Sequence, residues 1–389
     1  MKSVFVTSAN FRQALAVVRS LGKKNINVIA GEQTHFATAF FSKYCKGKVV
    51  YPSPNKQKEA FLEFIIEHIR KKNYDAIFPI EGNITLLVAK YKNEFSKYTR
   101  VPIADFQILS KTNNKLQVLK MAMKCGIPVP KTYFVNNIVK LSKLCKELTF
   151  PVVIKPQAST GSRGLAYVTI KDDFLIEYSK IHEVYPYPLV QEYIPKGGDT
   201  LGVSILMNKN SDVRAVFVHK RLREFPISGG PSTLRESIIY PEITEMAIEL
   251  LKSFNWWGVA MVEFKVDPRD EKPKLMEINP RFWGSLQLAI LSGVDFPYLL
   301  YKMTMQGDIK PILKYKTGIK CRWLLPGDIL HFLANPKRFN MDPSFFNFFN
   351  RQVGYDMLSS DDPCPTFGFM LAALRYVFDK QMWKFILRL

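Results

Sequence analysis

The chain has 389 residues, of which 47% are hydrophobic and 23% are charged. This length favours two or three compact units, and this composition excludes a disordered chain, a collagen-like fibre and a disulfide scaffold. The 55 lysines and arginines exceed the 34 acidic residues by +21, which indicates an anionic partner: a nucleotide, a nucleic acid, an anionic lipid or a polyanionic glycan.

The cysteines and the apolar runs indicate the compartment. Five cysteines are spread along the chain and form no Cys-x-x-Cys pair, which is typical of reduced thiols. The first residues turn polar at Ser8, and no run approaches about 18 uninterrupted apolar residues. We therefore expect a cytoplasmic protein without a membrane span.

Strand-like and helix-like stretches alternate at the start of the chain. In order they are residues 4–7, 11–21, 27–30, 61–70 and 75–80. This alternation predicts a doubly wound parallel sheet over roughly residues 1–105. The loop Ser8-Ala9-Asn10 after the first strand lacks the Gly-x-Gly-x-x-Gly fingerprint of dinucleotide sites.

A second unit is predicted from residue 109, where a helix runs to residue 124. Beyond Phe150 the pattern changes to strands and turns, which predicts an α+β region with antiparallel pairing. No helix-turn-helix, zinc or RNA-binding motif is present, so we expect no nucleic-acid partner.

Two strands, residues 261–267 and 274–279, read as one hairpin. A turn centred near Asp270 places Glu263 opposite Glu277, and the period of two puts Asn279 on the same face. Two carboxylates and an amide oxygen are suitable ligands for Mg²⁺. The alternative is a solvated strand face that carries incidental acids.

A phosphate site is predicted after the strand that ends in Lys155. The small residues that follow, Ser159, Thr160, Gly161 and Ser162, allow backbone amides to approach an anion. The order of a Walker loop is absent. An ordinary hairpin turn beside a lysine that reaches solvent is the competing interpretation.

Residues 189–199 form a candidate adenine site. The segment Gln191-Glu192-Tyr193-Ile194 offers apolar and backbone groups that can clamp an adenine ring. Asp199 follows across a Gly-Gly turn, so one of the two carboxylates can meet the base and the other a ribose hydroxyl. A plain hairpin is the alternative.

Taken in this order, the segments resemble the ATP-grasp superfamily, whose members clasp ATP between two α+β subdomains beside a Rossmann-like domain. The resemblance spans roughly residues 1–310 and includes Lys115, the Ile-Lys-Pro strand and Glu277-Ile278-Asn279-Pro280-Arg281. It implies an ATP-grasp fold, mixed α/β and α+β. The expected parts are a Rossmann-like domain at 1–108, a first subdomain with the phosphate loop at 109–188, a second with the adenine segment and magnesium site at 189–315, and an aromatic, basic helical extension at 316–389.

The resemblance also implies how the nucleotide is held. Lys115 and Lys155 are expected at the α- and β-phosphates, and Glu192 with Ile194 at the adenine. Asp199 is expected at the ribose. Phosphoryl transfer needs mainly positioning and charge stabilisation, which such residues supply.

For the metal, the resemblance implies that Glu263, Glu277 and Asn279 bind Mg²⁺, with Mn²⁺ as an alternative. Arg281 is expected to neutralise charge on the transferring phosphoryl group. The implied reaction activates a carboxylate as an acyl phosphate, which an amine or a thiol then attacks. Phosphate and ADP leave.

Residues 220–232 resemble a segment of the carboligase group that includes D-aspartate ligases. Arg221 and Arg223, beside a Ser-Gly-Gly turn, are expected to bind the substrate carboxylate, unless the segment is a basic surface loop. His219 is a secondary candidate for general base. Trp283 reads as core packing, with a place beside the acceptor pocket as the alternative.

The competing functions are a carboxylase of the biotin-dependent type, which needs bicarbonate, and a non-catalytic nucleotide sensor or polyanion-binding protein. The last residues predict an amphipathic cationic helix with Phe378, Phe385 and Leu389 on its apolar face. Such a helix packs on its own domain or lies peripherally at the inner membrane face, which would suit a lipid-linked glycan acceptor in cell-wall or polysaccharide modification. Small carboxylate and amine substrates and a homodimer complete the expectations.

Overall fold

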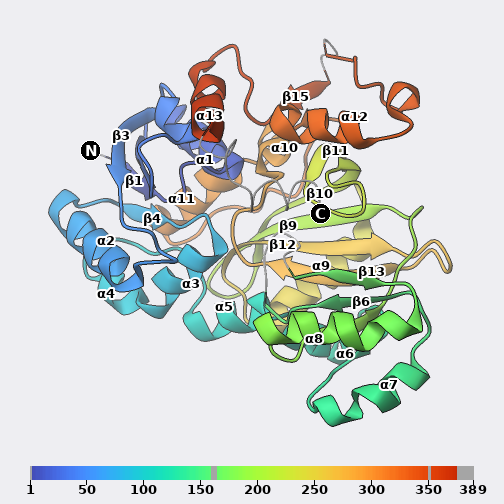
Figure 1. The fold of residues 1–389 in the computed structure, drawn as a ribbon. Helices are drawn as coiled ribbons and strands as arrows, with labels where there is room; N and C mark the ends of the chain where they lie inside the picture. The colour runs from blue at the N-terminus through green and yellow to red at the C-terminus, as the bar shows by residue number, and fades with distance from the viewer. Residues whose placement is uncertain (1, 159–163, 349–351, 375–389) are drawn as a thin grey trace.

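A computed structural model describes residues 2–158, 164–348 and 352–374 (Figure 1). Within these ranges the chain forms three β-sheets, of four, seven and four strands, that are covered by helices. The predicted phosphate loop at 159–162 and the predicted final helix with Phe378, Phe385 and Leu389 lie outside the described residues.

The N-terminal sheet is parallel, with strand order β3-β2-β1-β4. Its strands are β1 (Ser3–Val6), β2 (Asn27–Glu32), β3 (Cys45–Val50) and β4 (Ala76–Phe78). Its helices are α1 (Arg12–Gly22), α2 (Lys58–Lys72), α3 (Gly82–Lys90), α4 (Lys92–Ser96) and α5 (Phe106–Asn113). Apolar side chains of α1 pack on one face and those of α2 and α3 on the other, so the predicted doubly wound sheet is confirmed.

The order of these strands sets where functional groups gather. β1 and β4 pair in parallel, with Val6 opposite Phe78, so the chain leaves both strands at the same edge of the sheet. Ligand sites of open α/β sheets lie outside this carboxyl edge. Helix α1 begins there at Arg12, and helix α3 begins there after Glu81.

The second sheet is antiparallel, with strand order β5-β8-β6-β7. Its strands are β5 (Thr132–Tyr133), β6 (Val152–Lys155), β7 (Ala166–Val168) and β8 (Leu189–Glu192). The helices of this region are α6 (Lys115–Lys124), α7 (Leu141–Glu147) and α8 (Phe174–Val184). Phe174 and Tyr178 of α8 share one buried cluster with Val152 and Ile154 of β6, which fixes the strand that ends in Lys155.

The third sheet has seven strands in the order β13-β12-β9-β10-β11-β14-β15 and is antiparallel except for the parallel β14–β15 pair. Its strands are β9 (Thr200–Met207), β10 (Val213–Glu224), β11 (Ser232–Ile238), β12 (Gly258–Val266), β13 (Pro273–Asn279), β14 (Lys320–Arg322) and β15 (Val353–Tyr355). Helix α9 (Pro241–Ser253) packs on one face. Helices α10 (Leu286–Leu291) and α11 (Phe296–Gln306) pack on the other, together with α1. The N-terminal sheet and the large sheet thus share one core.

The C-terminal segment returns to the N-terminal domain. After α12 (Ile329–Ala334) and β15, helix α13 (Cys364–Leu374) lies beside the region of α1, as Figure 1 shows. The rings of Phe41 and Phe367 are 6.4 Å apart and meet edge to face. In the described part of the chain no helix is both long and apolar enough to cross a bilayer.

Candidate active site

The centre of the site is a pair of carboxylates on the β12–β13 hairpin. Glu263 and Glu277 are direct partners in the strand register, as the sequence predicts. The Asn279 amide nitrogen lies 3.0 Å from Glu263 Oε1 and 3.4 Å from Glu277 Oε1. The three predicted metal ligands are therefore together on one sheet face.

Cations surround this pair. Lys115 Nζ lies 3.0 Å from Glu277 Oε2, and Arg221 forms an ion pair with Glu263. Arg281 Nη2 donates to Asn279 Oδ1 at 3.0 Å. Three cationic side chains from separate stretches of the sequence thus converge on the hairpin.

Lys155 also reaches this region from the end of β6. Its side chain is buried, and burial together with the nearby Lys115 charge lowers the pKa of Lys155 to about 8, although the Glu277 charge opposes the shift. The backbone N–H of Lys115 donates to the Gln157 carbonyl at 2.7 Å. Helix α6 is thereby tied to the chain just after β6, which brings the two lysines together.

The two carboxylates are electrostatically distinct. Burial raises the pKa of Glu263, with Arg221 acting against the shift. Burial also acts to raise the pKa of Glu277. The positive charges of Lys115, Lys155 and Arg221 outweigh this effect, so the pKa of Glu277 is lowered. Glu277 is therefore the more readily ionised member of the pair.

A pocket with about 330 Å³ of empty space opens beside the hairpin. Its lining includes Lys115, Glu277, Asn279 and Arg281. Three of the residues that the resemblance assigns to phosphate and metal, Lys115, Glu277 and Asn279, thus border a common space. Sites of this kind combine concave shape with a few convergent polar groups.

The structure separates Arg221 from Arg223. The register of the β10–β11 pairing shifts between these two residues. The side chain of Arg223 forms a buried ion pair with Asp328, in which Nη1 lies 2.9 Å from Oδ2. Thr233 Oγ1 donates to the same carboxylate at 3.0 Å. Arg221 therefore lies at the carboxylate pair, whereas Arg223 is not brought to it.

The predicted adenine segment forms the end of β8 and the turn after it. The Glu192 carboxylate accepts from the Lys131 N–H and pairs with Arg269 and Lys274 at 2.8 and 3.2 Å. Its contact with adenine therefore stays a prediction. Gln191 is buried and donates to Thr132 Oγ1 at 2.7 Å.

The remaining residues of that segment lie between the two antiparallel sheets. Tyr193 packs edge to face on Tyr167 at 5.8 Å, and Lys265 Nζ is 5.7 Å from the Tyr193 ring centre. Ile194 is buried, and its carbonyl accepts from Lys265 at 2.8 Å. Asp199 is exposed. Its role at the ribose stays a prediction.

His219 and Trp283 are placed in the core. Burial, with the charges of Arg221 and Arg235, lowers the pKa of His219 to about 3. Its Nε2 lies 3.2 Å from Ser285 Oγ. A neutral imidazole of this kind is a weak base near pH 7. Trp283 is fully buried and meets Phe296 edge to face at 5.0 Å.

The sequence analysis did not identify two arginines, Arg12 and Arg235, that share one carboxylate partner. Arg12 of α1 and Arg235 of β11 both pair with buried Asp356, which follows β15. Arg12 and Asp356 are 344 positions apart in the chain. No local sequence pattern marks Arg12 or Asp356, because tertiary packing brings the two residues together.

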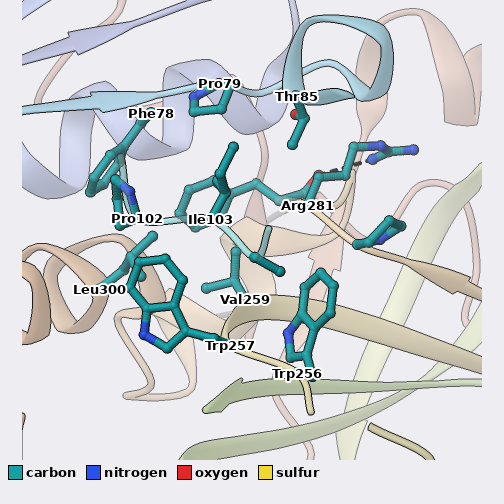
Figure 2. Close-up of a pocket in the computed structure, with 13 residues that line it drawn as sticks. Phe78, Pro79, Thr85, Pro102, Ile103, Trp256, Trp257, Val259, Arg281 and Leu300 are labelled. Carbon is teal, nitrogen blue, oxygen red and sulfur yellow. Dashed lines mark hydrogen bonds between the residues drawn. The ribbon is translucent and has the colours of Figure 1, made fainter. Parts of the chain in front are cut away.

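A second pocket, with about 320 Å³ of empty space, lies between the N-terminal sheet and the large sheet. Figure 2 shows Phe78, Ile103, Trp257 and Leu300 around it, with the guanidinium of Arg281 directed away from these apolar groups. The pocket is mainly apolar. Arg281 therefore separates it from the charged site.

The residues at the hairpin fit a magnesium nucleotide. Among the described residues no group of three or more His, Cys, Asp or Glu side chains is poised to hold a metal ion. Mg²⁺ is commonly bound by one or two carboxylates, with water and phosphate completing its shell. Glu263 and Glu277 would supply the carboxylates, and Lys115 and Lys155 would supply the positive charge that a triphosphate needs.

Comparison with known proteins agrees with this assembly. Residues 186–325 match the family described as "ATP-grasp in the biosynthetic pathway with Ter operon". Over 230 residues the chain is 27% identical to D-aspartate ligase from Enterococcus faecium (strain Aus0004), a match that covers 54% of this chain and 53% of that protein. The chain thus spans about half the length of this relative.

Solved structures share the fold. Biotin carboxylase from Campylobacter jejuni superposes with a TM-score of 0.69 at 18% identity and covers 82% of this chain and 74% of that one. L-amino acid ligase from Bacillus licheniformis gives 0.61 at 15% identity, with 80% and 78% covered. The protein therefore carries an ATP-grasp domain, and the expected ATP-grasp fold is confirmed.

Proposed function

We propose that this protein is an ATP- and Mg²⁺-dependent ligase that joins a carboxylate to an amine. The observation that carries the proposal is one pocket lined by Lys115, Glu277, Asn279 and Arg281, with Glu263 opposite Glu277 in the strand register and the buried Lys155 close enough to Lys115 and Glu277 to feel their charges. The similarity to a D-aspartate ligase supports an amide-forming reaction.

The proposed reaction has two steps. A carboxylate oxygen of the substrate attacks the γ-phosphorus of ATP, the bond to the β-phosphate oxygen breaks, and ADP leaves. The amine then attacks the acyl carbon, phosphate departs with the C–O bonding electrons, and the amine loses a proton to solvent. Mg²⁺ supplies charge neutralisation at the phosphates when it is bound.

Each charged side chain has a role in this proposal. Glu263, Glu277 and Asn279 hold the metal ion, while Lys115 and Lys155 bind phosphate oxygens. Arg281, which donates to Asn279, and Arg221, which pairs with Glu263, stabilise the negative charge that is transferred to the substrate. The covalent chemistry takes place between the substrates, so no side chain serves as nucleophile.

A carboxylase is the second candidate, because biotin carboxylase is among the structures with this fold. Bicarbonate would then replace the organic carboxylate at Arg221 and Arg281. The two reactions differ in whether ATP cleavage depends on bicarbonate or on an amine.

The test is phosphate release from ATP and Mg²⁺ over a panel of amino acids, short peptides and uronic acids, with and without bicarbonate. A ligase requires a carboxylate and an amine together, and the product mass equals their sum minus one water. Phosphate release that requires bicarbonate and ignores the amine would favour the carboxylase. Absence of phosphate release with every pair, in a protein that still binds ATP, would contradict catalysis.

A further inference from the structure

Three large apolar side chains are exposed on helix α12 and in the segment that follows it. The exposed fractions are 61% for Leu333, 69% for Phe339 and 56% for Phe346. Arg338 connects two of them, because its Nη1 donates to the Leu333 carbonyl at 3.3 Å and its Cζ lies 5.5 Å from the centre of the Phe339 ring. These three apolar residues are called the apolar patch below. Exposed apolar side chains that gather beside polar ones indicate an interaction surface.

The aromatic part of the patch is preformed around Phe332. The rings of Phe339 and Phe346 both meet the Phe332 ring edge to face, with ring centres 5.6 and 5.5 Å apart. Phe345 stacks on Phe332 at 4.4 Å and is itself buried. Two exposed rings that are seven positions apart in the chain are therefore held on one aromatic cluster.

Two arginines of the large sheet fix the segment beneath the patch. Arg322 Nη1 donates to the Phe345 carbonyl at 2.8 Å, and Arg223 donates to the Pro343 carbonyl. The Arg322 guanidinium also lies 5.4 Å from the centre of the Phe345 ring. The exposed rings thus stand on an anchored backbone. A partner that meets a preorganised surface pays a smaller entropic cost on binding.

Positive charge accompanies the patch. Lys337 and Arg338 are both exposed, and neither forms a salt bridge within the described part of the chain. Asp342 is the only acidic residue in the stretch 333–348. The chain as a whole carries a formal charge of +21. The partner that complements this surface is therefore apolar where it meets the rings and anionic beside them.

The place of the patch favours a broad surface over a small ligand. Figure 1 shows α12 and the loop after it at the outer edge of the molecule, beyond the large sheet. Neither of the two pockets described above includes a residue of the patch. Apolar side chains that enter the headgroup region, with basic side chains beside them at the lipid phosphates, are typical of proteins that lie on anionic membranes.

We propose that the apolar patch, with Lys337 and Arg338, is a peripheral docking surface for an anionic lipid membrane. Phe339 and Phe346 enter the interface between the headgroups and the acyl chains, and the two cations pair with lipid phosphates. The patch contributes no residue to the proposed active site. The docking surface therefore stands or falls separately from the ligase function.

The first test is co-sedimentation of the full chain with lipid vesicles. One set is made of phosphatidylcholine alone, and the other of equal parts of phosphatidylcholine and phosphatidylglycerol. The protein should bind the anionic vesicles at least about tenfold more tightly, and added salt should weaken this binding. Absence of binding to the anionic vesicles, or equal binding to both sets, overturns the proposal.

The second test removes the exposed rings. Phe339→Ser and Phe346→Ser should each weaken binding to anionic vesicles about fivefold, because each loses apolar surface that enters the lipid. Phe36→Ser is the matched control, since Phe36 is 55% exposed on the N-terminal domain, and it should bind as the wild type does. If Phe346→Ser lowers the melting temperature, Phe339→Ser and Leu333→Ser carry the test. Wild-type affinity in Phe339→Ser overturns the proposal.

The third test removes the cations. Lys337→Gln combined with Arg338→Gln should reduce the preference for anionic vesicles about tenfold. Lys209→Gln combined with Lys252→Gln removes the same charge from exposed positions elsewhere and should have little effect. Equal losses in the two double variants would assign the binding to the total charge of the protein and overturn the proposal.

A depth measurement distinguishes the patch from any other segment that meets the membrane. Phe339→Trp places a fluorophore at the most exposed ring of the patch, and Phe36→Trp places one at the control position. Vesicles that contain brominated lipid should quench the additional fluorescence of Phe339→Trp and leave that of Phe36→Trp unchanged. Vesicle binding without quenching at residue 339 overturns the proposal.

The other candidate occupant of the patch is a second copy of the chain. Size-exclusion chromatography with light scattering compares the wild type with Phe339→Ser. A dimer that dissociates in Phe339→Ser would identify the patch as a subunit interface and overturn the membrane proposal. Phosphate release by Phe339→Ser should equal that of the wild type. If the wild type binds vesicles but no substrate pair releases phosphate, the ligase function fails and the docking surface stands.

Discussion

Glu263 and Glu277 are in direct register across β12 and β13, with one amide, that of Asn279, within reach of both carboxylates. Like charges that face each other in a hairpin are unfavourable unless something compensates them. Here Arg221 compensates Glu263 and Lys115 compensates Glu277. Each carboxylate therefore has a cation of the protein as its partner, and in the proposed function a bound Mg²⁺ would take over part of this compensation.

Replacement of one carboxylate by its neutral isostere tests this arrangement. Glu277→Gln keeps the shape of the side chain and removes its charge, so it should lower phosphate release at least 100-fold, which is the scale for loss of a group that stabilises transition-state charge. Far-UV circular dichroism should be unchanged. Steady-state phosphate release at saturating ATP and Mg²⁺ is the measurement.

The matched control is Glu245→Gln on α9, which is exposed and lies on the opposite face of the large sheet. It should retain wild-type activity. Residual activity above one tenth of the wild type in Glu277→Gln would remove Glu277 from the metal site.

The hairpin shows what sequence alone can supply. A short turn and a period of two fix which residues of neighbouring strands meet, so Glu263, Glu277 and Asn279 were predictable together. The parallel sheet was also predictable from local patterns, because strand-like and helix-like stretches alternate along the sequence. Neither inference needs contacts between distant parts of the chain.

Arg223 and Arg12 show where local reasoning ends. Arg223 is two residues from Arg221 and was expected beside it, but an irregularity in the β10–β11 pairing turns it toward Asp328. Arg12 depends on Asp356 and Trp323, which reach it only after the C-terminal segment has packed on α1. Bulges and long-range contacts of this kind leave no periodic trace in the sequence.

The lowered pKa of Lys155 predicts a pH dependence of nucleotide binding. With a pKa of about 8, Lys155 is largely charged at pH 7 and largely neutral at pH 9.5. An anionic phosphate binds the charged form, so ATP affinity should fall as the pH rises through 8, by a factor that approaches ten per pH unit. Isothermal titration of ATP with Mg²⁺ at pH 7.0 and 9.5 measures the change.

Lys155→Met should bind ATP weakly at pH 7 and should lose the part of the pH dependence that Lys155 supplies. Lys180→Met is a matched control, because Lys180 is an exposed lysine of α8 that pairs with Glu177. If ATP affinity falls equally with pH in Lys155→Met and in the wild type, a group other than Lys155 is responsible for the pH dependence.

His219 should contribute a pH-dependent component to stability. Its pKa is about 3 in the folded protein, below the usual 6.5, so the unfolded chain binds its proton more readily. Stability from neutral His219 is complete above about pH 6.5 and is lost as the pH falls toward 3, by about 1 kcal/mol per pH unit. Urea unfolding of the wild type and His219→Gln at pH 7.0 and 5.0 should show a smaller decrease in the variant.

The buried ion pair between Arg235 and Asp356 should be a large determinant of stability. Asp356→Asn leaves the Arg235 guanidinium buried without a carboxylate, and loss of one partner of a buried pair costs about 3–5 kcal/mol. Asp361→Asn, which affects exposed pairs with Lys23 and Lys43, should leave the melting temperature close to that of the wild type. Thermal unfolding followed by circular dichroism compares the two variants. Because an apolar side chain removes the stranded charge, Arg235→Met combined with Asp356→Asn should recover part of the loss, and a double variant less stable than Asp356→Asn alone would contradict this account.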